Sequence, residues 1–212
     1  MFSKFLRTFT RMPLFLMGGV ALAMVFPHTR WAGGRDVSMA TWGFGNAMVW
    51  EYEPWRLYTS AIVHMDLGHA LGNALLWLLM CVFARKMGVL TAALWALASA
   101  WPITTLCLVL WKQPLMVLGA SGVLYAFWAV LTVLALNHAK YWKIAIAPGL
   151  CLLAKLVLDG AWAAPVRYTP DMTWPVVQAI HLSGAIVGAS IGLLMVVLVR
   201  LLRRPTGEPI QA

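Results

Sequence analysis

Four polar residues lie in or beside apolar segments and have side chains that could do chemistry together. Ser121 stands in the sequence GASG, and His181 lies in a later apolar segment. A serine hydroxyl becomes a useful nucleophile when a base removes its proton, and histidine is the usual base near neutral pH. His69 and Asn73 are four residues apart, so on a helix they share one face. Both could donate hydrogen bonds to a negatively charged intermediate.

The composition shows what kind of chain must position these residues. Of 212 residues, 62% are hydrophobic and 11% are charged, against about 45–50% and about 25% in soluble domains. A soluble chain of this size buries only about 70% of its surface and could not hide so much apolar material. The net charge is +9, but Lys and Arg flank the apolar segments, as membrane topology requires, which argues against nucleic-acid binding. The composition therefore indicates an integral membrane protein.

Six apolar segments approach the length of about 20 residues that a membrane-spanning helix needs. They do not alternate apolar and polar residues as barrel strands do, so helices are expected. The sequence predicts an all-α polytopic membrane protein, a six-helix bundle that forms one domain over 1–212. Its core covers about 13–199, with a long outer loop at 28–66 and a cytoplasmic tail at 200–212. The predicted spans are 13–27, 67–83, 89–110, 119–136, 144–158 and 176–199.

The basic residues in the connections are distributed unequally between the two sides. One side has Lys4, Arg7, Arg11, Arg85, Lys86, Lys140, Lys143, Arg200, Arg203 and Arg204, and the other has Arg30, Arg35, Arg56, Lys112 and Arg167. Because cytoplasmic connections are enriched in Lys and Arg, both termini are predicted to be cytoplasmic. The first segment also has features of a signal peptide, whose cleavage would leave five helices; we favour its retention.

This orientation places the four polar residues at one depth. The second, fourth and sixth predicted helices all run inward, and Ser121, His181 and the pair of His69 and Asn73 lie near their outer ends. Polar groups inside spans are costly and are functional candidates by default. Ser121 also lies at a helix N-terminus, where free N–H groups and the helix dipole favour negative charge. We predict a Ser121–His181 dyad with no metal or other cofactor.

Neighbouring residues are expected to support this dyad. Gly119 and Gly122 would let a substrate backbone approach. Tyr125, one turn after Ser121, would pack against the His181 ring and fix its orientation. A stripe of small residues on the sixth helix would let it pack closely on the fourth. The stripe consists of Gly184, Gly188 and Gly192.

Each feature also has a purely structural explanation. A membrane histidine or asparagine often makes an interhelical hydrogen bond, and small residues often serve packing alone. Their coincidence at one depth favours catalysis. A small transporter or metal channel using His64, His69 and His181 is a further alternative. His64 and His69 are five residues apart and would point about 140° apart on a helix, which argues against a shared metal site unless His64 lies in the loop.

Taken together, these residues resemble the rhomboid family of intramembrane serine proteases. The resemblance covers essentially the whole six-helix core and rests on the order of the motifs along the helices. It implies that Ser121 is the nucleophile, that His181 is its base, and that His69 and Asn73 assist the oxyanion. The matching residues are Trp55, Arg56, Thr59, His64, His69, Asn73, Gly119, Ser121, Gly122, Tyr125, His181, Gly184 and Gly188.

The resemblance implies a serine endopeptidase that cleaves transmembrane or membrane-anchor segments of substrate proteins near the outer face of a bacterial inner membrane. Its partners would be such substrates and membrane lipid. Segments 155–160 and 175–182 are similar to the rhombosortase subgroup, which is thought to process proteins with a C-terminal, glycine-containing anchor helix. Tyr125 is instead the residue of general rhomboids, so both assignments stay open. The alternative is an inactive rhomboid-like protein that binds membrane clients; the presence of both dyad residues argues against it.

Overall fold

The computed structural model describes residues 14–29, 33–45, 53–109, 116–161, 166–169, 172–174 and 178–202. Within them, a long helix lies at each of the six positions predicted from the apolar segments. That all six cross a bilayer stays a prediction. The long helices are α2 (Leu14–Val25), α6 (Leu67–Lys86), α7 (Leu90–Val109), α8 (Ser121–Leu136), α9 (Trp142–Ala161) and α10 (Gln178–Leu202).

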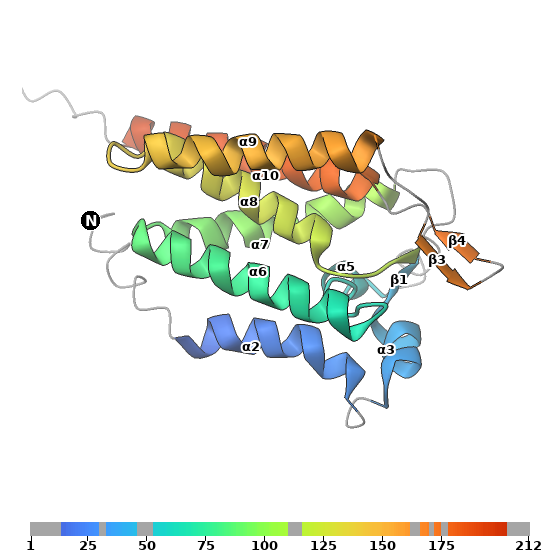
Figure 1. The fold of residues 1–212 in the computed structure, drawn as a ribbon. Coiled ribbons are helices and arrows are strands. Elements are labelled where there is room, and N and C mark those ends of the chain that lie inside the picture. Colours follow the sequence, from blue (N-terminus) through green and yellow to red (C-terminus); the bar gives the residue numbers. More distant parts are fainter. Residues whose placement is uncertain are drawn as a thin grey trace, which may run out of the picture.

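Helix α8 is the centre of the bundle and lies between α9 and α10 on one side and α6 and α7 on the other (Figure 1). Its side chains are buried along most of its length. The close packing of α10 on α8 follows the predicted glycine stripe. A Cβ atom on Gly184 would overlap the carbonyl oxygen of Gly122, and one on Gly188 would overlap that of Ala126. Larger residues at these two positions would therefore force the helices apart.

The outer surface of the bundle is apolar, as a lipid-facing surface must be. On α6, Leu75 and Leu79 are 59% and 58% exposed, whereas Ala70 and Trp77 on the other face are buried. An exposed leucine stripe of this kind is typical of a surface that faces lipid or another apolar partner rather than water. Helix α6 and the segment Ile180–Leu202 of α10 are long and apolar enough to cross a membrane, with mean hydropathies of 1.7 and 2.5.

The short elements gather at the end of the bundle where α8 begins (Figure 1). Strands β1 (Phe44–Gly45) and β2 (Met116–Val117) pair antiparallel, as do β3 (Val166–Thr169) and β4 (Met172–Trp174). The all-α prediction describes the bundle but missed these strands, because two to four residues are too few to show alternation. The remaining short elements are η1 (Phe26–His28), α3 (Arg35–Trp42) and α5 (Arg56–Thr59).

Arg56 organises the long predicted connection between α2 and α6. Its guanidinium is buried, donates to the carbonyl oxygens of Ala40 at 3.0 Å and Gly43 at 2.7 Å, and pairs with the carboxylate of Glu53. The planar fork of arginine suits several acceptors at once. The connection is thus built around one buried cation.

The described part of the chain begins and ends at the same end of the bundle, where α2 starts and α10 stops (Figure 1). The basic residues before position 14 and after position 202 lie outside the described residues. Which end faces the cytoplasm stays a prediction based on charge.

Candidate active site

Ser121 is the first residue of α8 and is half-buried. Gly119 enters the helix with a φ of +97°, a conformation that glycine adopts readily, and its N–H donates to the carbonyl oxygen of Ser60 at 2.9 Å. The N–H of Leu124 donates to the carbonyl oxygen of Ala120 at 2.8 Å. The N–H groups of Ser121, Gly122 and Val123 therefore have no partner within the helix and are available to a developing negative charge.

His181 lies in the first turn of α10 and is buried. Its ring stacks parallel to that of Tyr125, with centroids 4.3 Å apart and 1° between the planes. Tyr125 is four residues after Ser121, on the same face of α8, so this stack puts His181 on the side of α8 that bears Ser121. The predicted packing of Tyr125 on His181 is confirmed.

Gly122 has a different role from the one expected. A Cβ atom on Gly122 would lie 2.5 Å from Cγ1 of Ile180, the residue before His181. The space beside this glycine is therefore occupied by α10, and the expectation that it admits a substrate backbone is wrong. Gly122 instead lets the histidine-bearing turn of α10 approach the start of α8.

His64 is fully buried just before α6 and connects three parts of the site. Its Nδ1 lies 2.9 Å from the carbonyl oxygen of Ile62, and its Nε2 lies 2.9 Å from Nδ2 of Asn73 and accepts the N–H of Ala120 at 3.2 Å. A backbone N–H can only donate, so Nε2 must carry the lone pair and Nδ1 the proton. The neutral ring thus holds the residue before Ser121 and the amide of Asn73.

His69 and Asn73 lie on the first turns of α6, where Asp66 caps the helix by accepting the N–H of His69 at 2.7 Å. The exposed His69 ring is edge-on to His64, with centroids 5.3 Å apart. Its Cε1 would lie 3.5 Å from a Cβ on Gly119. Asn73 is buried, and its NH2 group has two hydrogens. One points to His64, and the other remains for a second acceptor.

Burial keeps His64 neutral. The loss of water around the ring, together with the nearby His69, lowers the pKa of His64 from 6.5 to about 4, although the bond to Ile62 opposes the shift. Protonation would place a hydrogen on Nε2 and remove the acceptor that Ala120 and Asn73 share. Protonation of His64 would therefore destabilise the arrangement at the start of α8.

From the sequence, His64 is only one of the residues that resemble the rhomboid family and a ligand in the metal-channel alternative. The sequence did not predict that His64 connects Asn73 of α6 to Ala120 at the start of α8. The signal for its position was Asp66, a favoured cap residue that ends the loop and starts the helix. The angular argument against a shared His64 and His69 site does not apply, because His64 lies in the loop before the helix, the exception that the argument allowed, and the two rings are close. The metal alternative is disfavoured for another reason: both ring nitrogens of His64 are engaged within the protein.

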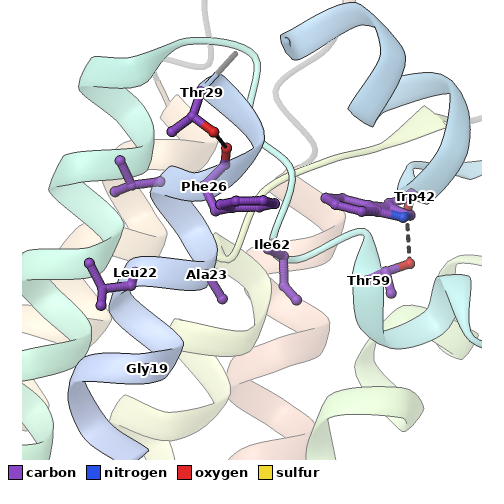
Figure 2. Close-up of a pocket in the computed structure, with 9 residues that line it drawn as sticks. Gly19, Leu22, Ala23, Phe26, Thr29, Trp42, Thr59 and Ile62 are labelled. Atoms are coloured by element: carbon purple, nitrogen blue, oxygen red, sulfur yellow. Dashed lines mark hydrogen bonds between the residues drawn. The ribbon is translucent and has the colours of Figure 1, made fainter. Parts of the chain in front are cut away.

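A cavity of about 580 Å³ lies elsewhere, between α2 and the α3 and α5 region (Figure 2). Phe26 and Trp42 approach each other across it, and the hydroxyl of Thr59 donates to the carbonyl oxygen of Trp42 at 2.9 Å. Its lining does not include Ser121, His181, His69 or Asn73, but it does include Ile62, whose carbonyl oxygen contacts Nδ1 of His64. It is lined by Gly19, Leu22, Ala23, Val25, Phe26, Thr29, Trp42, Thr59 and Ile62.

The candidate residues thus come from α6, α8 and α10 and meet at the end of the bundle that carries the short elements. They combine a hydroxyl at a helix N-terminus, a buried imidazole stacked on a tyrosine, and further side-chain donors. In a comparison with models of known families, the Rhomboid domain matches residues 51–198, more than half of the chain. Comparison with curated proteins gives no match.

Proposed function

The chain belongs to the rhomboid family, and we propose that it is an intramembrane serine endopeptidase with Ser121 as nucleophile and His181 as general base. Members of this family are integral membrane proteins and are generally intramembrane serine proteases, although inactive members exist. The family alone therefore does not decide whether this chain cleaves, and the proposal depends on the residues at the start of α8.

The observation that carries the proposal is the position of Ser121 between two fixed neighbours. Ala120 donates its N–H to His64, and Gly122 packs against Ile180. The next residue of α10 is His181, held by its stack on Tyr125. A serine that only served packing would need no oriented imidazole on the same side of its helix, whereas a nucleophile needs a base of fixed orientation.

In the proposed reaction, Oγ of Ser121 attacks the carbonyl carbon of the scissile peptide bond while His181 accepts the hydroxyl proton. The carbonyl oxygen becomes an oxyanion. When the tetrahedral intermediate collapses, the C–N bond breaks and His181 gives its proton to the leaving amine. His181 then takes a proton from water, which attacks the ester on Ser121. The bond between the acyl carbon and Oγ breaks, and His181 returns the proton to Oγ. The products are a new carboxyl terminus, a new amino terminus and free Ser121.

The oxyanion would be held by donors from two helices. The N–H groups of the first turn of α8 have no helical partner, and Asn73 has one NH2 hydrogen left after its contact with His64. His69, exposed beside Gly119, supplies a third type of donor. Removing one such donor typically costs about 100-fold to 1,000-fold in kcat.

The proposed substrates are transmembrane or membrane-anchor segments that unwind at the outer side of a bacterial inner membrane. A helix hides its carbonyl groups in its own hydrogen bonds, so cleavage requires local unwinding. We extend the proposal to substrates with a C-terminal, glycine-containing anchor helix, as expected for a rhombosortase. Support for this extension comes from sequence segments 155–160 and 175–182.

The test is labelling of the purified, detergent-solubilised protein with a fluorophosphonate, followed by intact mass measurement. Wild type should gain one adduct, Ser121→Ala should gain none, and His181→Ala should react much more slowly. Ser99→Ala is the matched control, because Ser99 is an exposed serine of α7 whose hydroxyl donates to a carbonyl of its own helix. It should label as wild type does.

A folded Ser121→Ala protein that still takes up the probe would refute the assignment of the nucleophile. A folded wild type that takes up neither a fluorophosphonate nor a second inhibitor class would favour the alternative, an inactive family member that binds membrane clients. Folding of each variant is judged from its thermal midpoint and its elution from a sizing column.

A further inference from the structure

Basic side chains gather at the end of the bundle opposite Ser121. Helices α6, α8 and α10 end there, and α9 begins there (Figure 1). The exposed basic residues of this end form what we call the basic face: Arg85, Lys86, Lys140, Lys143 and Arg200. Among the described residues, the acidic ones belong to α3, to the connection before α6 and to the last turn of α9. Within the described part of the chain, no carboxylate therefore neutralises the basic face.

Two long-range hydrogen bonds hold this face together. The hydroxyl of Tyr141 donates to the carbonyl oxygen of Lys86 at 3.0 Å, which fixes the start of α9 beside the end of α6. Arg200 donates to Oδ1 of Asn137 at 2.7 Å, which fixes the end of α10 beside the end of α8. The partner of Arg200 is a neutral amide, so the positive charge of the arginine is retained. The charges thus sit on a braced surface rather than on a flexible tail.

Interfacial aromatic residues lie among these charges. The Nζ of Lys140 is 5.3 Å from the ring centre of Tyr141, and the Nζ of Lys143 is 5.4 Å from that of Trp142. Both distances are within the range of a cation–π contact. Trp142 is 46% exposed, and tryptophan and tyrosine favour the headgroup level of a bilayer. The lysines are thus placed at the depth where lipid phosphates lie.

We propose that the basic face binds the headgroups of anionic phospholipids, with Lys140 and Lys143 as the principal contacts. The positive charge of the basic face is complementary to a phosphate-bearing headgroup of net negative charge. The adjacent rings of Tyr141 and Trp142 favour a lipid over a soluble anion, because these residue types prefer the headgroup level of a bilayer. Basic surfaces at the cytoplasmic ends of membrane helices attract anionic lipid with about 1 kcal/mol per Lys or Arg, equivalent to about fivefold in affinity. This proposal is independent of the catalytic activity of Ser121.

The experiment measures binding of phosphatidylglycerol to the full-length protein in neutral detergent micelles by native mass spectrometry, with phosphatidylcholine of the same acyl chains as the comparison. The double variant Lys140→Gln/Lys143→Gln should weaken phosphatidylglycerol binding by about 25-fold, because each lysine contributes about fivefold to the affinity. Lys140→Arg/Lys143→Arg keeps the charge and should restore binding. Lys155→Gln is the matched control, because Lys155 is an exposed lysine about 18 Å further along α9; it should leave binding unchanged.

Wild type should prefer phosphatidylglycerol to phosphatidylcholine. Equal binding of the two lipids would overturn the proposal, as would equal loss in the Lys155→Gln and double-glutamine variants. Displacement of phosphatidylglycerol by inorganic phosphate at similar concentration would overturn the assignment to lipid, because the site would then recognise a free anion. The thermal midpoint and the elution from a sizing column should be the same in wild type and the double variants, which shows that they are folded.

Discussion

Replacing His64 with glutamine should change how the stability of the protein depends on pH. In the folded protein, burial and the neighbouring His69 lower the pKa of His64 to about 4. In the unfolded chain it returns to about 6.5. Between these values the unfolded state binds a proton that the folded state does not, so acidification favours unfolding. The stabilisation by neutral His64 is fully present above pH 6.5 and is lost as the pH falls towards 4.

The size of the effect follows from the difference between the two pKa values. A shift from 6.5 to about 4, at 1.36 kcal/mol for each unit, gives about 3 kcal/mol. Because His64 is fully buried, solvent screening does not reduce this figure substantially. The free energy of unfolding of wild type should therefore fall by about 3 kcal/mol more than that of His64→Gln between pH 7 and pH 4.

The variant should begin from a lower stability at pH 7. A glutamine oxygen can replace Nε2 as the acceptor for Ala120, but no donor then reaches the carbonyl oxygen of Ile62. Leaving a buried polar group unsatisfied costs about 1–3 kcal/mol. The difference in unfolding free energy between wild type and variant should thus shrink on acidification and be about zero, or reversed in favour of the variant, at pH 4.

The measurement is the free energy of unfolding in mixed micelles of neutral detergent and dodecyl sulfate, at several pH values. His138→Gln, which removes a histidine at the other end of the bundle, is the control for the loss of an imidazole. Parallel pH profiles for wild type and His64→Gln would refute the reasoning, because His64 would then have the same pKa in the folded and unfolded states. Stability is the appropriate readout, since labelling of the serine also depends on the protonation of its base.

Substitutions at three positions test the packing of the site and of the connection before α6. Gly188→Ala should lower the unfolding free energy by about 1–3 kcal/mol, because its Cβ would overlap the carbonyl oxygen of Ala126; unchanged stability would mean that α10 does not pack this closely on α8. Tyr125→Leu should slow fluorophosphonate labelling more than Tyr125→Phe, because only phenylalanine keeps a ring stacked on His181. Equal labelling rates of the two variants would show that the stack does not orient the histidine. Arg56→Lys should lower the thermal midpoint and reduce the unfolding free energy by about 1–3 kcal/mol. One ammonium cannot serve two carbonyl groups and a carboxylate in the same geometry as the guanidinium. An unchanged midpoint would show that Arg56 does not organise the connection between α2 and α6.

The sequence by itself determined the positions of the six helices and the spacing of the candidate residues within each helix. An apolar segment in a membrane must satisfy its backbone groups internally, so length and hydropathy suffice to place a helix. The spacing of Ser121 and Tyr125, and that of His69 and Asn73, then follows from 3.6 residues per turn. The stripe of Gly184, Gly188 and Gly192 likewise indicates, from the sequence alone, a close contact of the sixth helix with the fourth.

Only the tertiary structure decided which distant groups meet. The contact between His64 and Ala120 joins residues 56 positions apart, and that between Arg200 and Asn137 joins residues 63 apart. Neither leaves a periodic pattern in the sequence, because each depends on how two helices are placed in space rather than on either helix alone. The same reason explains why Gly122, read from its sequence as open space for a substrate, is filled by Ile180 of α10.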